Sequence, residues 1–192
     1  LDLLRIRPLA GAILIGVALY VMIGVFDPLW VVMMDDLGAP NWIGNAGVSI
    51  FGMPWILFAT VGGAIAQKYG PFRVSAFGLV IGAFYMAAYG FIGSPYVMLS
   101  VAVTQSALDA LTVTGTGIAV ANAAPPQRQA GASGLLGGIQ TLTGGVVALA
   151  AGSVYEHFGR GVAFGATGVA MLSLVCIGCL LAGPKLLRRP NH

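Results

Sequence analysis

Six long apolar runs, separated by short breaks rich in Gly, Pro and charged residues, constrain the fold of this chain more than any other feature. A helix needs about 20 apolar residues to cross the hydrocarbon core of a bilayer, and the shortest run has 21. The runs cover residues 8–34, 42–66, 72–92, 96–123, 129–154 and 162–183. We therefore predict an all-α integral membrane protein in which residues 1–192 form one domain of six transmembrane helices.

The composition excludes the other broad classes of protein. Hydrophobic residues make up 58% of the chain and charged residues 8%, whereas a soluble domain has about 25% charged residues. A disordered chain or a disulfide-rich secreted scaffold would also be far less apolar. The nine basic residues are scattered, so no stripe for nucleic acid is formed. Cys176 and Cys179 lie in an apolar run without a second pair, and we expect neither a metal site nor a cofactor.

The basic residues predict the orientation of the helices. Cytoplasmic loops of membrane proteins carry an excess of Lys and Arg. If the N-terminus is cytoplasmic, eight of the nine basic residues lie inside, and Arg160 alone lies outside. The eight are Arg5, Arg7, Lys68, Arg73, Arg128, Lys185, Arg188 and Arg189. We expect both termini to be cytoplasmic.

A weak internal repeat divides the chain into two units. The pattern G-x-x-x-polar-x-aromatic-G occurs at residues 63–70 and again 89 residues later, at 152–159. The first copy falls on the predicted inner side and the second on the outer side. Units over about 8–92 and 96–183 would therefore have opposite orientations, a plan known from secondary transporters.

The first copy of this pattern carries a family resemblance. Residues 63–73 resemble the G-x-x-x-D-[RK]-x-G-[RK]-[RK] loop of the major facilitator superfamily, although Gln67 replaces the Asp and Pro71 replaces a basic residue. The matching residues are Gly63, Lys68, Gly70 and Arg73. Residues 123–131 are similar to the P-x-x-x-R-G link before helix 11 of that family. The degenerate loop and this link together resemble helices 7–12, the C-terminal half of the fold.

The resemblance implies a transporter rather than an enzyme. Residues 26–29, Phe-Asp-Pro-Leu, are similar to the seventh helix of drug–proton antiporters. This similarity implies proton-coupled efflux of small molecules by alternating access, in a bacterial plasma membrane. The substrate would lie between this half and a missing N-terminal six-helix half. Two alternatives remain open: a self-standing six-helix protein that pairs with a second copy as a transporter or channel, and an inactive truncated fragment.

In the family, the loop over residues 63–73 latches one conformation through charge contacts. Gly63 would let two helices approach, and Gly70 would permit a tight turn. Lys68 and Arg73 would make the charge contacts, but the Asp that completes the loop is absent at Gln67. A plain positive-inside anchor is an equally good interpretation of these residues.

Small residues predict where helices pack closely, because apolar lipid gives no hydrophobic drive between helices. Gly78 and Gly82 have G-x-x-x-G spacing in the third run, and Gly134 and Gly138 have it in the fifth. Gly144, Ala148 and Gly152 continue a small-residue face there. We expect the helix over 129–154 to be tightly packed.

Asp109 is the strongest candidate for a functional residue. It lies in the middle of the fourth run, where a charged side chain costs about 2.5–3.5 kcal/mol on insertion scales. Gln105, Asp109, Thr112 and Thr116 follow the spacing i, i+4, i+7, i+11, which places them on one face of a helix. We expect this polar stripe to line a central cavity, with Asp109 binding a proton or a cationic substrate group. The alternative is a structural Asp that is hydrogen-bonded inside the bundle.

Asp27 is a second candidate, on the first run just before Pro28. It would line the outer part of the cavity, or it would cap a helix segment after a proline break. Tyr20, Trp55 and Gln140 are further cavity candidates, although each is more often a packing residue. The sequence contains no nucleophile motif, metal-ligand cluster or phosphate-binding loop, so we predict no enzyme activity.

Overall fold

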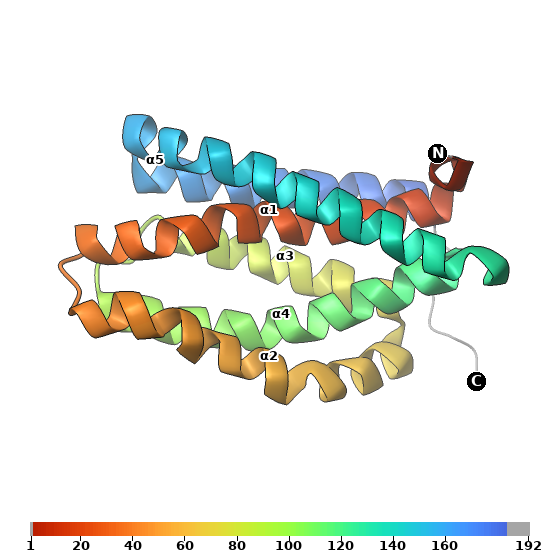
Figure 1. Cartoon of the computed structure of the whole chain (residues 1–192), viewed down its shortest axis with the longest axis horizontal. Helices are drawn as coiled ribbons and strands as arrows, with labels where there is room; N and C mark the ends of the chain where they lie inside the picture. The colour runs from red at the N-terminus through yellow and green to blue at the C-terminus, as the bar shows by residue number, and fades with distance from the viewer. Residues whose placement is uncertain (1, 184–192) are drawn as a thin grey trace.

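Five helices that are long and apolar enough to cross a membrane dominate the computed structural model, which describes residues 2–183. They are α1 (Arg7–Asp36), α2 (Asn41–Tyr69), α3 (Pro71–Tyr89), α4 (Pro95–Ala123) and α5 (Gln129–Ala182). Two short 3-10 helices, η1 (Asp2–Arg5) and η2 (Pro126–Arg128), precede α1 and α5. Figure 1 shows the long helices side by side along one axis. The described part of the chain contains no strand, which confirms the predicted all-α class.

The helix boundaries follow local sequence signals. Pro8, Pro71 and Pro95 lie in the first turns of α1, α3 and α4, where the missing N–H of proline leaves no hydrogen bond unmade. Only Gly70 separates α2 from α3, with φ 95° and ψ 118°. A positive φ of this size is accessible to glycine because glycine has no Cβ. The expected tight turn is therefore formed at Gly70.

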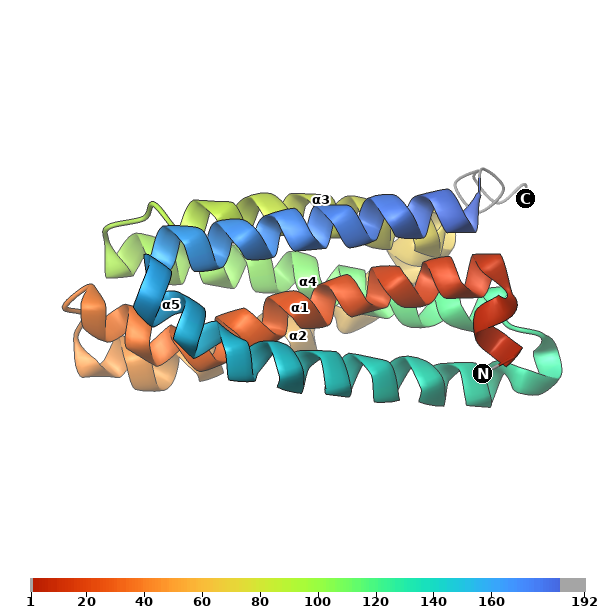
Figure 2. The ribbon, with the colours of Figure 1, turned by 90° about the horizontal axis from the view of Figure 1, so that it is seen from above.

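The element α5 has 54 residues and consists of two helical segments that meet at a kink at Gly159. The break is shorter than the predicted 155–161, because this range is helical except at Gly159. Gly159 has φ 79° and ψ 169°, and this one non-helical residue replaces the expected connecting loop. Figure 2 shows α5 running along the bundle and then returning in the opposite direction. The sequence pattern at 152–159 indicates a turn, but it does not show that one non-helical residue is enough to form it.

The helix α1 forms the centre of the bundle. It is the most deeply buried of the five helices and packs mainly against α5, whereas α2 packs mainly against α4, and α3 lies against both α4 and α5. The backbones of α1 and α5 approach closely at Gly24: a Cβ added there would lie 2.7 Å from the carbonyl oxygen of Gly144. Small residues thus let helices meet, as expected without hydrophobic drive between them.

The prediction of a tightly packed glycine face on α5 is confirmed at Gly144, which packs against α1, and is wrong for Gly134, Gly138 and Gly152. A Cβ added at Gly134, Gly138 or Gly152 would meet nothing within 4 Å. The side of α5 that faces α1 carries Leu136 and Gln140 instead, both buried. The spacing of glycines defines a helix face but does not determine which neighbour covers it. On α3 the expectation for Gly78 is confirmed, because this glycine packs directly against the side chain of Thr112.

An aromatic cluster fixes one end of α1, α2 and α3. Trp30 is fully buried, and its ring centroid lies 5.1 Å from that of Phe51. Phe26 lies 5.5 Å from Phe51 and 5.1 Å from Tyr89, measured between ring centroids. Such tilted and edge-on pairs stabilise packing beyond area burial alone. The cluster therefore holds Phe26 and Phe51 in fixed positions beside the space between α1, α2 and α4.

Candidate functional site

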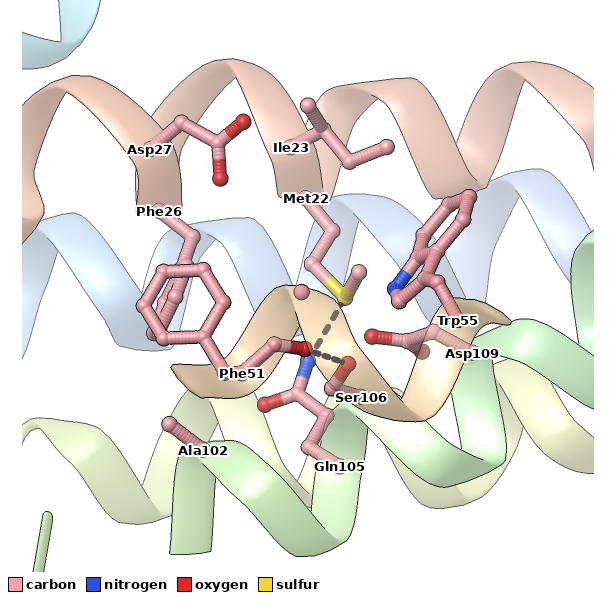
Figure 3. A pocket seen from close by; sticks show the side chains of 11 residues that line it. Met22, Ile23, Phe26, Asp27, Phe51, Trp55, Ala102, Gln105, Ser106 and Asp109 are labelled. Carbon is pink, nitrogen blue, oxygen red and sulfur yellow. Dashed lines mark hydrogen bonds between the residues drawn. The ribbon is translucent and has the colours of Figure 1, made fainter. Parts of the chain in front are cut away.

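A cavity of about 300 Å³ lies between α1, α2 and α4. Its size is at the lower end of the range for small-molecule sites, about 300–1,000 Å³. Figure 3 shows its walls at close range. The eleven described residues that line it are Met22, Ile23, Phe26 and Asp27 of α1, Phe51, Gly52 and Trp55 of α2, and Ala102, Gln105, Ser106 and Asp109 of α4.

Asp109 brings a carboxyl group into the centre of the bundle. It is the middle residue of α4, with 14 residues of the helix before it and 14 after it. Its side chain is 6% exposed and lines the cavity. Ionisable groups inside membrane-spanning helices are costly and are found at functional sites. This geometry places a buried carboxyl group at half the length of the helix.

Gln105 lies one helical turn before Asp109, on the same wall. It is 3% exposed, and its Nε2 donates a hydrogen bond to Met22 Sδ over 2.8 Å. The Oε1 atom of the same amide is buried and has no hydrogen-bond partner among the described residues. A thioether sulfur is a weak acceptor, and the Gln105 side chain also interacts with that of Asp109. These contacts use the amide nitrogen and leave the amide oxygen without a partner in the described part of the chain.

The wall on α2 is aromatic. Phe51 and Trp55 are four residues apart, a spacing that places both on one face of the helix, and both are half-buried on the cavity. The Ser106 hydroxyl donates a hydrogen bond to the Phe51 carbonyl oxygen, which ties α4 to α2. Figure 3 shows this bond and the bond from Gln105 to Met22 crossing the space between the helices.

Asp27 lines the cavity from α1 but is exposed in this chain. The helix α1 continues through Asp27 and Pro28 to Asp36. No new helix begins after the proline, so Asp27 caps no helix. Figure 3 draws the Asp27 carboxylate beside the α1 ribbon. The cavity therefore has one buried carboxyl group and a second one at its edge.

The predicted stripe on α4 is buried throughout, but only half of it reaches the cavity. Thr112 and Thr116 are 1% and 2% exposed. Thr112 packs against Gly78 of α3, and Thr116 packs against Gly16 of α1. Each hydroxyl donates to the backbone carbonyl four residues earlier. The stripe turns away from the cavity because α4 meets α1 and α3 at this level, so the two threonines are packing residues.

Two other predicted cavity residues also lie outside the cavity. Gln140 of α5 donates from Nε2 to the Gly16 carbonyl oxygen over 3.0 Å, which joins α5 to α1. Tyr20 is half-buried and packs near Gly144 of α5. Both residues face α5 or α1 rather than α2 and α4. Trp55 is the one member of this group that the structure places on the cavity wall.

The predicted gating loop lies at the junction of α2 and α3. Lys68 and Arg73 are exposed, and Lys68 Nζ lies 5.4 Å from the centre of the Tyr69 ring. A Cβ added at Gly63 would lie 3.6 Å from the Thr114 side chain on α4, which is an ordinary contact. A Cβ added at Gly62 would lie 3.0 Å from the Leu111 Cα, so Gly62 packs more closely against α4. The other predicted inner-side residues Lys185, Arg188 and Arg189 lie outside the described residues.

Most of the apolar wall could not be predicted from the sequence. Met22 and Phe26 are four residues apart on α1, as Phe51 and Trp55 are on α2, and such pairs share a helix face. The spacing is common in any membrane helix, so it could not single out these residues without a known neighbour. The described residues contain no group of three His, Cys, Asp or Glu side chains that could hold a metal ion.

Comparison with known proteins identifies the family. Residues 12–192 of the chain match the model of the family described as "Major Facilitator Superfamily". No curated protein and no solved structure matches it. The match includes α2 to α5 entirely and all but the first turns of α1, so it contains every residue of the cavity. The chain belongs to the Major Facilitator Superfamily, and it is a multi-pass membrane protein of this family of small-molecule transporters.

Proposed function

We propose that this chain moves a small molecule across a membrane by alternating access, with the cavity between α1, α2 and α4 as its substrate site. The observation that carries this proposal is the position of Asp109, buried at the middle of α4 and facing a cavity of about 300 Å³. Secondary transporters place their substrate and coupling-ion sites near the bilayer midplane. A buried carboxyl group at that depth fits such a site.

The same proposal assigns two crossings to α5. A straight helix of 54 residues would be about 80 Å long at 1.5 Å per residue, far longer than the hydrocarbon core of about 30 Å. The non-helical Gly159 divides it into segments of membrane-spanning length. The chain then has six spans, arranged as inverted units over about 8–92 and 96–183, with both termini in the cytoplasm.

The proposed coupling ion is the proton, and the proposed direction is efflux. Asp109 is the one carboxyl group among the cavity residues that is buried, and Asp27 lies at the edge. A carboxyl group binds and releases a proton without any cofactor, and proton relays in membrane transporters are built from such residues. Alternate protonation and substrate binding at Asp109 would link the two fluxes.

A second six-helix body is proposed to face the cavity. Asp27 lies within the apolar α1 helix and is exposed in this chain, and lipid is a costly surrounding for a carboxylate. An N-terminal half or a second copy of the chain would cover this edge and complete the site. The family plan, in which two six-helix halves enclose the substrate, favours the N-terminal half.

The test is proton coupling in proteoliposomes that contain this chain together with the second six-helix body, as solubilised from native membranes. An entrapped pH-sensitive dye reports the decay of an imposed pH gradient when a panel of small amphipathic compounds is added. We expect at least one compound to accelerate the decay, and Asp109→Asn to slow that decay at least about 10-fold, since positioned proton transfer contributes 100-fold or more to rates. Asp35→Asn, a change at an exposed Asp near the end of α1, should leave the decay unchanged. An equal decay with Asp109→Asn would contradict the proposal.

A further inference from the structure

Most polar groups of the cavity are hydrogen-bond acceptors, and the exception is the indole N–H of Trp55, which is a donor. Asp27 and Asp109 offer carboxylate oxygens, and Gln105 offers its amide oxygen. The Ser106 hydroxyl is already bonded to the Phe51 carbonyl, and the Gln105 amide nitrogen donates to Met22. None of the eleven described lining residues is Lys, Arg or His. The lining therefore favours a ligand that brings donors and positive charge.

The unpartnered oxygen of Gln105 points to a specific donor. Oε1 is buried without a hydrogen-bond partner in the described chain, and Gln105 as a whole is 3% exposed. In Figure 3 this oxygen points toward Ala102, another residue of the cavity wall. A buried acceptor without a partner is costly, and buried polar groups in native proteins are nearly always paired. An N–H group of a ligand would supply the missing partner.

The remaining walls suit an apolar body. Phe26, Phe51 and Trp55 contribute three aromatic rings, and cations are attracted to the faces of such rings, most strongly to Trp. A cavity of about 300 Å³ has the size of a small-molecule site and greatly exceeds the volume of a single inorganic cation. The lining therefore favours an organic cation over a metal ion.

We propose that the cavity binds an organic cation that carries at least one N–H group and an apolar body. The Asp109 carboxylate balances the charge, Gln105 Oε1 accepts the N–H hydrogen bond, and the aromatic wall encloses the body. This inference rests on the proposed function, in which the cavity is the substrate site, and it specifies the class of substrate.

Three matched probes test the inference with the purified full chain in lipid nanodiscs, by isothermal titration calorimetry. They are 2-(1-naphthyl)ethylammonium, its N,N,N-trimethyl derivative and the neutral 2-(1-naphthyl)ethanol. The first has charge and N–H donors, the second has charge alone, and the third has neither charge nor an N–H group. We expect the ammonium probe to bind at least about 10-fold more tightly than either of the others, because charge-assisted hydrogen bonds are about twice as strong as neutral ones.

Two variants separate the roles of the residues. Asp109→Asn should weaken binding of both cations about 10-fold or more and leave the alcohol unchanged. Gln105→Leu should reduce the preference for the ammonium over the trimethyl probe to within about threefold and leave the trimethyl probe unchanged. If Gln105→Leu does not fold, Gln105→Met keeps an unbranched side chain and serves the same purpose. Thr104→Val, on the exposed side of α4, should change none of the three affinities.

The inference is overturned if the alcohol binds the wild-type chain as tightly as the ammonium probe, if no probe binds, or if Gln105 variants keep the full preference for N–H. These results would leave proton coupling intact, because gradient decay with other compounds measures that coupling separately. Conversely, normal discrimination among the probes combined with unchanged gradient decay in Asp109→Asn would reject the proton role and keep the cation site.

Discussion

At the scale of single residues, the buried polar groups of α4 show what a sequence can predict about this site. The position of Asp109 at the middle of an apolar run is visible in the sequence, because any such carboxyl group must find protein or water. The spacing of Gln105, Asp109, Thr112 and Thr116 also predicts a shared buried side, and all four are buried. Which of them reaches the cavity depends on the neighbouring helix at each level, and the sequence of α4 alone does not contain that information.

The contact between Tyr155 and Asp36 gives a prediction at this scale. Tyr155 Oη donates to Asp36 Oδ2 over 2.6 Å and joins the end of α1 to α5 just before Gly159. Hydrogen bonds to charged groups contribute about 1.5–3 kcal/mol, although bonds in membrane proteins average nearer 0.6 kcal/mol. We expect Tyr155→Phe to lower the free energy of unfolding by about 1 kcal/mol, measured by denaturant titration of the detergent-solubilised chain.

The matched control for this change is Tyr96→Phe, which removes a hydroxyl from a ring that is 57% exposed and should leave stability within about 0.5 kcal/mol of the wild type. Equal effects of the two substitutions would show that the bond between Tyr155 and Asp36 does not stabilise the turn.

At the scale of elements, helix positions were largely predictable and helix contacts were not. The ranges predicted for the first four runs lie within a few residues of α1 to α4, because apolar length and prolines at helix starts are local signals. The glycine spacing of α5 predicts close packing, yet Gly134 and Gly138 face open space in this chain. Packing partners depend on the arrangement of all helices. A glycine face can lie against a helix of the same chain, lipid or another protein, so glycine spacing alone does not identify its partner.

The turn in α5 gives a prediction at this scale. Gly159 has φ 79°, a conformation that costs a residue with a Cβ about 1–2 kcal/mol. No neighbouring atom lies within 4 Å of an added Cβ there, so any effect of Gly159→Ala comes from the backbone rather than from a clash. We expect Gly159→Ala to lower the free energy of unfolding by about 1–2 kcal/mol, measured by the same denaturant titration.

Gly161→Ala is the matched control, because Gly161 is also exposed in α5, has open space around an added Cβ and has no positive φ. Replacement of Gly by Ala in a helix stabilises by up to about 1 kcal/mol. A Gly159→Ala variant as stable as Gly161→Ala would mean that the turn at Gly159 does not require a left-handed residue.

At the scale of the whole molecule, the sequence predicted the class, the membrane location and the family, and the structure added the cavity. Apolar length and low charge are properties of the entire chain, so they can be determined from the sequence without any knowledge of packing. The cavity requires three helices that are distant in sequence, α1, α2 and α4, to meet in one register. The aromatic contact between Trp30 and Phe51 joins α1 to α2, and the hydrogen bond from Ser106 to Phe51 joins α4 to α2. No pattern within one helix reveals these contacts.

The central claim of alternating access is tested most directly by the accessibility of Gly52. This residue lines the cavity, and an added Cβ there meets nothing within 4 Å, so Gly52→Cys introduces a thiol without a clash. With Cys176 and Cys179 replaced by Ala, a charged, membrane-impermeant thiol reagent is applied to oriented proteoliposomes from one face or the other. Gly165→Cys on α5, outside the cavity and also free of close neighbours, is the control and should not react from either face. We predict that Gly52→Cys reacts from both faces, at rates that a bound ligand changes in opposite directions; reaction from one face alone would contradict alternating access.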